Sequence, residues 1–360
     1  FIQGDTPVDP PEAVPGGAQT VPFKQIGNIE RVDIFVDKVT EPSLATDEFD
    51  FALSETQLGE VEQFSLTDEA DAFGFTGFPG TYSVEELAPL PDGWVLESAT
   101  CTIDGVGSFD PATLNLVDGD VAYCTFTNVQ LGTVIVEKQT EPDGDPATFD
   151  FSGDVAGTIG DGGTLTLDVL PGQYTSTETV PAGWTLTGIV CDDGNSSGDT
   201  GTATATFNVE AGETVKCTFT NTKAGAIVIE KQTLPDGDPA TFDFAGDVSG
   251  TLSDGQTASQ AVAPGQYSSS ETVPDGWDLT VIVCDDGNSS GDTATATATF
   301  KVYPGETVKC TFTNTKDGQI IVEKQTLPDG DPATFDFAGD VSGTLSDGQT
   351  ASQAVAPGQY

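Results

Sequence analysis

The sequence contains no histidine and no methionine, and only 11 of its 360 residues are lysine or arginine. The lack of histidine excludes Ser-His-Asp and Cys-His catalysis and removes the commonest transition-metal ligand. With 58 acidic residues the formal net charge is −47, which argues against nucleic acid and anionic membrane surfaces as partners, because both need basic patches. Carboxylate pairs are expected by chance in so acidic a chain, and no constellation indicates an enzyme that acts on an external substrate.

Long apolar runs are absent as well, so no segment is predicted to insert directly into a membrane, and no signal peptide is visible. Cysteine is scarce, and none of the cysteine spacings fits a zinc site. An even number of cysteines, with one close-set pair in each copy of a repeat, indicates disulfides and an oxidising, extracellular setting. The expected pairs are Cys101 with Cys124, Cys191 with Cys217, and Cys284 with Cys310.

A repeat of 93 residues organises the chain, as the positions of Lys138, Lys231 and Lys324 show. Residues 230–267 are identical to residues 323–360, where the sequence stops inside a further copy, so we expect the natural protein to continue. We predict a Pro/Gly-rich extended arm or linker, a divergent β-sandwich domain, two β-sandwich repeats and an incomplete repeat, at residues 1–28, 29–130, 131–223, 224–316 and 317–360.

Each copy is predicted to be all-β, because apolar and polar residues alternate over short segments rich in β-forming residues. Turn sequences such as EPDGDP and LPGQ separate these segments. Seven short strands in one copy indicate an immunoglobulin-like β-sandwich. In the second copy the strands are expected near 133–140, 147–152, 163–169, 173–179, 184–190, 202–209 and 214–221. The junctions between copies are very short, and we therefore expect the domains to stack as an extended rod.

Four residue types recur together, and one of them is a lysine on an apolar strand. Side chains alternate across a strand, so Val134, Val136 and Lys138 face the same way. In each of three copies a glutamate stands four residues after the tyrosine of a PGxY turn, a tryptophan follows a later PxG, and an asparagine ends the CTFTN strand. The recurring residues after the lysine are Glu86, Glu178 and Glu271, then Trp94, Trp184 and Trp277, then Asn128, Asn221 and Asn314.

The segments VIVEK, YTSTETVPAGW and FTN resemble those of prealbumin-like, collagen-adhesin B-type domains, which occur in bacterial pilins and surface adhesins. The resemblance extends from about residue 30 to the end of the chain and implies an inverse immunoglobulin-like sandwich. Two features depart from the usual pattern. The second and third copies have one residue fewer between the glutamate and GW, and the disulfide is an addition that would make a further cross-link redundant.

The resemblance also implies a spontaneous isopeptide bond in each domain, between the lysine of the first strand and the asparagine of the last. Burial lowers the pKa of a lysine, so its neutral amine can attack the amide. Burial raises the pKa of a carboxyl group, which can then hold a proton and relay it as ammonia leaves. The alternative is a strand-end lysine that only forms an ion pair with the glutamate. The implied pairs are Lys38 with Asn128, Lys138 with Asn221 and Lys231 with Asn314, helped by Glu86, Glu178 and Glu271.

The loop CDDGNSSGD, present in the second and third copies, is a candidate calcium site. Oxygen-bearing residues alternate there as in the start of a calcium-binding loop, but Thr204 stands where a bidentate glutamate is expected. The alternative is a solvated Asx-rich turn that contains a glycosylation sequon. No other cofactor is expected. The candidate ligands are Asp193, Asn195, Ser197 and Asp199, and Asp286, Asn288, Ser290 and Asp292.

These features predict a structural component of an extracellular, cell-surface fibre, stalk or filament built from internally cross-linked domains. Its partners would be copies of itself or other surface proteins. One alternative is an adhesin whose ligand-binding tip lies in residues 29–130 or outside this fragment, and it predicts an exposed aromatic patch in the divergent copy. Another is a set of spacer repeats in a larger secreted enzyme.

Overall fold

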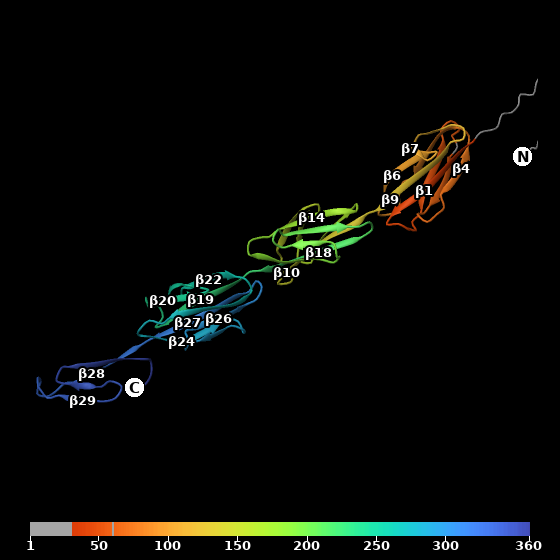
Figure 1. Cartoon of the computed structure of the whole chain (residues 1–360). Helices are drawn as coiled ribbons and strands as arrows, with labels where there is room; N and C mark the ends of the chain where they lie inside the picture. Colours follow the sequence, from red (N-terminus) through yellow and green to blue (C-terminus); the bar gives the residue numbers. More distant parts are fainter. Residues whose placement is uncertain (1–30, 60) are drawn as a thin grey trace, which may run out of the picture. The chain divides into compact units, whose positions relative to one another are not determined.

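Short strands separated by glycine- and aspartate-rich turns account for all regular structure in the described part of the chain. The computed structural model describes residues 31–59 and 61–360 (Figure 1). These residues include no helix, and therefore none that is long and apolar enough to cross a membrane. The chain divides into two compact units, one ending at Val129 and the other beginning at Gln130. The predicted arm at residues 1–28 lies outside the described residues.

The described residues of the first domain form nine strands in two sheets, and the last of these strands ends at Gln130. These strands are β1 (Val32–Glu41), β2 (Phe49–Glu55), β3 (Val61–Leu66), β4 (Phe73–Gly77), β5 (Gly80–Glu86), β6 (Trp94–Ile103), β7 (Val106–Phe109), β8 (Leu114–Leu116) and β9 (Val121–Gln130). One sheet has the order β4-β1-β9-β6-β7 and the other the order β3-β2-β5-β8. Their inward side chains form one apolar core.

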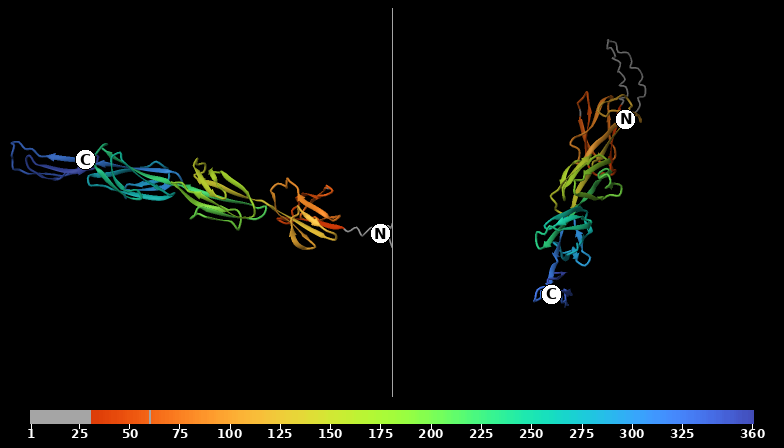
Figure 2. Two further views of the ribbon diagram at one scale, coloured as in Figure 1. Left: turned by 90° about the horizontal axis from the view of Figure 1, so that it is seen from above. Right: turned by 90° about the vertical axis from the view of Figure 1, so that its left-hand side faces the viewer.

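The second domain, coloured yellow to green in Figure 2, also consists of strands. It repeats the two-sheet plan, with one sheet of four strands and one of five. Its strands are β10 (Gly132–Glu141), β11 (Thr148–Gly153), β12 (Gly157–Gly160), β13 (Thr164–Val169), β14 (Gly172–Thr179), β15 (Trp184–Cys191), β16 (Ser197–Asp199), β17 (Thr204–Val209) and β18 (Thr214–Lys223). The sheet orders are β13-β10-β18-β15 and β12-β11-β14-β17-β16.

The third domain has the same topology, and four further strands follow it. The third domain comprises β19 (Gly225–Leu234), β20 (Thr241–Gly246), β21 (Gly250–Ser253), β22 (Thr257–Val262), β23 (Gly265–Thr272), β24 (Trp277–Cys284), β25 (Ser290–Asp292), β26 (Thr297–Val302) and β27 (Thr307–Lys316). The last four strands are β28 (Gly318–Glu323), β29 (Phe335–Phe337), β30 (Gly343–Leu345) and β31 (Thr350–Val355).

The prediction of tandem all-β, immunoglobulin-like domains is confirmed, and all seven strands predicted for the second copy are present. Two short strands were not predicted. β12 begins and ends with glycine, and β16 lies inside the loop that was interpreted as a turn. Both are edge strands, held by pairing with β11 and β17 respectively, so tertiary contacts override a local sequence typical of turns.

The first strand of each complete domain pairs in parallel with the last strand of the same domain. β1 pairs with β9, β10 with β18, and β19 with β27. Because the two paired strands run in the same direction, the chain enters each domain at one end of this sheet and leaves it at the other. A pulling force applied along the chain therefore loads these two strands first.

An aspartate that the sequence analysis did not single out fixes the turn after each first strand. In the second domain Asp161 accepts hydrogen bonds from the backbone N–H groups of Thr140, at 2.6 Å, and Gly144, at 2.8 Å. The two carboxylate oxygens of Asp161 thereby fix the conformation of the EPDG turn that follows β10. Asp68, Asp254 and Asp347 make the corresponding pair of bonds in the other copies.

The structure pairs the six cysteines within copies, as Cys101–Cys124, Cys191–Cys217 and Cys284–Cys310. Each disulfide joins neighbouring strands of one sheet. In the second domain it links the end of β15 to the middle of β18, where the two cysteines lie opposite each other.

Loss of one disulfide should destabilise its own domain. The Cys191–Cys217 bond spans 26 residues, and closing a loop of this size contributes about 3–4 kcal/mol on the chain-entropy model. We expect the Cys191→Ala, Cys217→Ala double variant to unfold at lower denaturant concentration than the parent, as measured by circular dichroism. Non-reducing peptide mapping supplies the control, and linkages between different copies would contradict the pairing.

Candidate functional site

The recurring lysine lies in the core of each complete domain. On β10 the inward face carries Val134, Val136 and Lys138, all three with no solvent exposure, while Ile135 and Glu137 on the other face are half-buried. The strand alternation therefore drives a lysine into an apolar layer. Transfer of an unpaired ammonium group into such a layer is very costly, so its surroundings must compensate.

Three oxygens and one ring surround the amine of Lys138. Its Nζ donates to the backbone carbonyls of Gln139, at 2.7 Å, and Phe219, at 3.0 Å, and to Oδ1 of Asn221, at 3.0 Å. The ring of Phe149 lies beneath it, with the centroid 4.3 Å from Nζ. These oxygens can accept all three protons of an ammonium group. The lysine is thus fully coordinated as a cation before any bond forms.

Asn221 and Glu178 approach the lysine from different sheets. Asn221 belongs to β18, which pairs in parallel with β10, and Lys138 lies opposite Phe219, two residues before Asn221. Glu178 belongs to β14 of the facing sheet and is buried. Its Oε1 accepts a hydrogen bond from Nδ2 of Asn221 at 2.8 Å and lies 4.0 Å from Nζ of Lys138. The carboxyl group therefore contacts the amide nitrogen that would leave.

The third domain reproduces this arrangement. Nζ of Lys231 is 2.9 Å from Oδ1 of Asn314 and 3.9 Å from Oε1 of Glu271, and Nδ2 of Asn314 donates to the same carboxylate oxygen at 2.7 Å. The ring of Phe242 lies beneath the amine, with its centroid at 4.1 Å. The lysine, glutamate and asparagine were predicted from the sequence to lie together. The phenylalanine was not predicted, although a TFDF segment recurs in these copies.

The first domain has the same residues in a looser arrangement. Lys38 lies 3.9 Å from Oε1 of Glu86, and Nδ2 of Asn128 donates to the other oxygen of Glu86 at 3.0 Å. Oδ1 of Asn128, however, is buried without a hydrogen-bond partner, and Lys38 donates instead to the carbonyls of Val39 and Phe126. In the last copy, the equivalent Lys324 is only half-buried.

The tryptophans lie next to this cluster and pack against the phenylalanine ring beneath the amine. Trp184 packs edge-on against Phe149, with ring centroids 5.2 Å apart, and Trp277 packs in the same way against Phe242. In the first domain Trp94 makes the equivalent contact with Phe49. The tryptophan thus supports the ring on which the lysine rests.

Burial shifts the pKa of both titratable partners toward the neutral form. Desolvation lowers the pKa of Lys38, Lys138 and Lys231 to about 8, against the opposing effect of the neighbouring glutamate. Desolvation also raises the pKa of Glu86 and Glu178, and it raises the pKa of Glu271 to about 7. Near neutral pH a neutral amine and a protonated carboxyl group can therefore coexist in one domain.

This geometry suits attack of the amine on the asparagine amide. The neutral Nζ would form a bond to Cγ of Asn314 while the bond from Cγ to Nδ2 breaks. The amine gives up a proton and the leaving nitrogen gains one, so that ammonia departs. Glu271 lies close enough to both nitrogens to relay that proton.

The candidate calcium ligands serve as turn-forming acceptors in the structure. Asp193 accepts a hydrogen bond from the hydroxyl of Ser196, and Asp199 accepts bonds from the backbone of Gly201 and the hydroxyl of Thr202. Within residues 31–59 and 61–360, no group of three or more acidic, cysteine or histidine side chains could hold a metal ion. Calcium binding by the two loops stays a prediction. The third-domain loop forms the corresponding turns around Asp286, Asn288, Ser290 and Asp292.

Comparison with protein families assigns the chain to a family. The family model of the prealbumin-like fold domain matches residues 134–223 and 227–316, which together make up half of the sequence. The chain belongs to this family. Its prealbumin-like domains are thus confirmed, as the resemblance implied. Comparison with curated proteins finds no match.

Several solved structures are similar to this prealbumin-like chain. The TIE protein of Bacillus anthracis is 20% identical with a TM-score of 0.35, covering 80% of this chain and 51% of its own. The pilus adhesin SpaC of Lactobacillus rhamnosus GG, in its open conformation, is 15% identical with a TM-score of 0.27, covering 79% and 43%. The major pilin subunit BcpA of Bacillus cereus is 12% identical with a TM-score of 0.34, covering 80% and 100%. The chain spans about half the length of the first two structures.

The rate of bond formation should depend on pH with a maximum between the two shifted pKa values. In the third domain the fraction of neutral Lys231 rises as the pH passes about 8, and the fraction of protonated Glu271 falls as the pH passes about 7. Their product is therefore bell-shaped. Chains recovered unfolded in denaturant and refolded for a fixed time at a series of pH values should lose ammonia fastest in this interval, as measured by intact mass.

The Glu271→Gln variant is the matched control for this pH profile. Glutamine keeps the size of the side chain but cannot relay a proton, so the third domain should react about 10²–10⁴-fold more slowly. The second domain in the same molecule retains Glu178 and should react as before. A rate that keeps rising above the pKa of Lys231, or an unaltered rate in the variant, would exclude the acid role of the glutamate.

Proposed function

We propose that the chain is a structural component of an extracellular, cell-surface fibre, stalk or filament, in which each complete domain is internally cross-linked. The observation that carries this proposal is the buried contact between Lys138 and Asn221, repeated by Lys231 and Asn314 at 2.9–3.0 Å between Nζ and Oδ1. These contacts join the first and last strands, which a pulling force loads. Such a placement serves a protein that bears tension along its chain.

The other features of the chain agree with this function. Three intradomain disulfides suit an oxidising, extracellular location. The net charge of −47 and the absence of histidine disfavour nucleic-acid binding and common forms of catalysis. We propose copies of the chain itself or other surface proteins as its partners, and we propose no enzymatic activity toward an external substrate.

An adhesin is the second candidate, because the first domain exposes aromatic side chains. Tyr123 is 51% exposed, Phe78 54% and Phe109 42%. Tyr123 stacks on Phe35 across β1 and β9, with ring centroids 5.2 Å apart. At the same register positions the second domain carries Ile135 and Lys216, so the aromatic pair is a particular property of the first domain.

Intact mass of the reduced protein tests the cross-links directly. Each isopeptide bond removes one ammonia, so the second and third domains should together lower the mass by two ammonia molecules, and the first domain by a third if its looser set reacts. Lys138→Ala should abolish one loss and Lys231→Ala another. A parent mass equal to the sequence mass would leave only the ion-pair interpretation of these residues.

Single-molecule pulling tests the mechanical role. A bond between Lys138 and Asn221 diverts the load past the residues between them, so the cross-linked domain should not extend by unfolding. In Lys138→Ala the same domain should release roughly 200 Å of chain, since the disulfide still shortens the path and extended residues span at most about 3.3–3.6 Å each. The third domain is the internal control, and equal extension of the parent and the variant would refute the role.

A further inference from the structure

The first domain buries a carboxyl group at the end of an inner strand. Glu55 is the last residue of β2, where it pairs with Tyr82, and it is only 7% exposed. The strands β11 and β20 of the other complete domains end at Gly153 and Gly246 and carry no buried acidic residue. Burial of a carboxyl group is costly unless a partner compensates for the lost hydration. Glu55 is therefore a candidate for contact with a further polar group.

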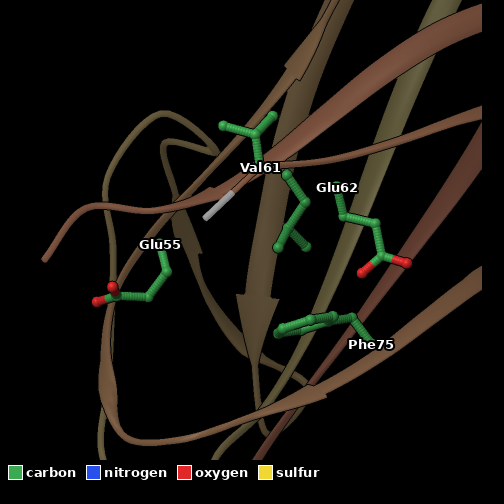
Figure 3. A pocket seen from close by; sticks show the side chains of 5 residues that line it. Glu55, Val61, Glu62 and Phe75 are labelled. Atoms are coloured by element: carbon green, nitrogen blue, oxygen red, sulfur yellow. The ribbon is translucent and has the colours of Figure 1, made fainter. Parts of the chain in front are cut away.

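Glu55 lines an open cavity of about 340 Å³, together with Leu53, Val61, Glu62 and Phe75 (Figure 3). Leu53 is buried, whereas Val61 is 61% exposed at the mouth. In Figure 3 the carboxyl group of Glu62 turns toward Phe75, and that of Glu55 lies on the opposite side of the cavity. The walls are thus apolar and the two ends are acidic.

The hydrogen bonding of Glu55 leaves it capacity for a further donor. Its Oε2 accepts a bond from the backbone N–H of Leu58, which fixes the carboxyl group at the rim. Among the residues that the structure describes, no hydrogen bond engages Oε1 of Glu55. A carboxylate has about four acceptor positions, so a cation entering the cavity would find an acceptor already held in place.

The cavity opens between two edge strands. β3 supplies Val61 and Glu62 and is the outermost strand of its sheet, and β4 supplies Phe75 and is the outermost strand of the other sheet. The outer backbone edge of β3 has no partner strand in the described part of the chain. An extended polypeptide can add to such an edge through main-chain hydrogen bonds, with every second side chain directed toward the domain.

We propose that this side of the first domain binds an extended segment of a partner polypeptide, which pairs with β3 and inserts a lysine side chain into the cavity. The four-carbon stem of lysine would lie against Leu53 and Phe75. Its ammonium group would meet the carboxylate of Glu55, and Glu62 on the opposite side would add to the negative charge of the cavity. A single carboxylate reached past apolar walls suits the compact charge and flexible stem of lysine. The strongly negative chain also attracts a basic partner.

A short capped peptide of alternating threonine and valine with one central lysine is a suitable probe. We expect it to cause saturable shifts in the NMR signals of Val61 and Phe75 of the complete chain. The same peptide with norleucine in place of lysine keeps the stem and lacks the charge, and it should bind at least about tenfold more weakly. Equal binding of the two peptides, or no saturable shift at millimolar peptide, would overturn the proposal.

Substitutions in the cavity locate the binding. Glu55→Val removes the carboxylate and should bind the lysine peptide at least about tenfold more weakly, with thermal melting as the check that the domain still folds. Glu62→Gln should weaken binding to a smaller degree. Glu85→Gln removes one exposed charge from β5 and should change the affinity less than about twofold. Undiminished binding by Glu55→Val and Glu62→Gln would overturn the site.

This inference is independent of the cross-links. Glu55 does not contact Lys38, Glu86 or Asn128 in the hydrogen bonds and ion pairs of the described residues. Glu55→Val should therefore lose as many ammonia molecules as the parent. If the peptide does not bind but ammonia loss is normal, only the proposed docking site is refuted. If ammonia loss is missing but the peptide binds normally, only the proposed cross-links are refuted.

Discussion

A lysine amine held inside a small apolar core is the constraint on which the rest of each domain depends. The strand pattern of β10 places Lys138 there, and its neighbours are arranged to offset the cost of burial. Two backbone carbonyls and the amide of Asn221 accept its protons, and a phenylalanine ring lies under it. The parallel pairing of the first and last strands brings two of these acceptors, on Phe219 and Asn221, within reach. A sandwich without this pairing would leave the amine only the carbonyl of Gln139 on its own strand as an acceptor.

The last strand is held from both sides within its own sheet. In the order β13-β10-β18-β15, the strand β18 is tied to β15 through Cys217, and Asn221, four residues farther on, contacts the lysine of β10. The disulfide opposes separation of the antiparallel strands β15 and β18. A covalent bond between Lys138 and Asn221 would instead oppose shear between the parallel strands β10 and β18. Under the proposed function, the two cross-links would therefore not be redundant.

Much of the fold and part of the site could be predicted from the sequence, because both rest on regular patterns along the chain. Alternation placed Lys138 on the inward face, and the 93-residue repeat identified which glutamate and asparagine recur with it. Phe149 beneath the amine and Asp161 at the turn were missed, since each acts across a sheet or a turn whose register is set by tertiary pairing. β12 was missed because its glycines are typical of turns. The burial of Glu55 could not be predicted either, because it follows from the pairing of β2 with β5.

The differences between the first domain and its two neighbours separate two requirements on one fold. Where the second and third domains agree, the agreement concerns the core: the same lysine cluster, the same aromatic support and the same disulfide. The first domain departs in its looser lysine cluster and also at its surface and edge. An aromatic pair replaces an aliphatic residue and a lysine on the outer face of the sheet, and β2 ends in a buried carboxyl group beside the edge strand β3. Repetition of the core would preserve the proposed cross-link, whereas variation at an edge changes what the domain can contact. The prealbumin-like sandwich permits both, because the parallel strands β1 and β9 lie inside their sheet and the strands beside the cavity, β3 and β4, lie at the margins.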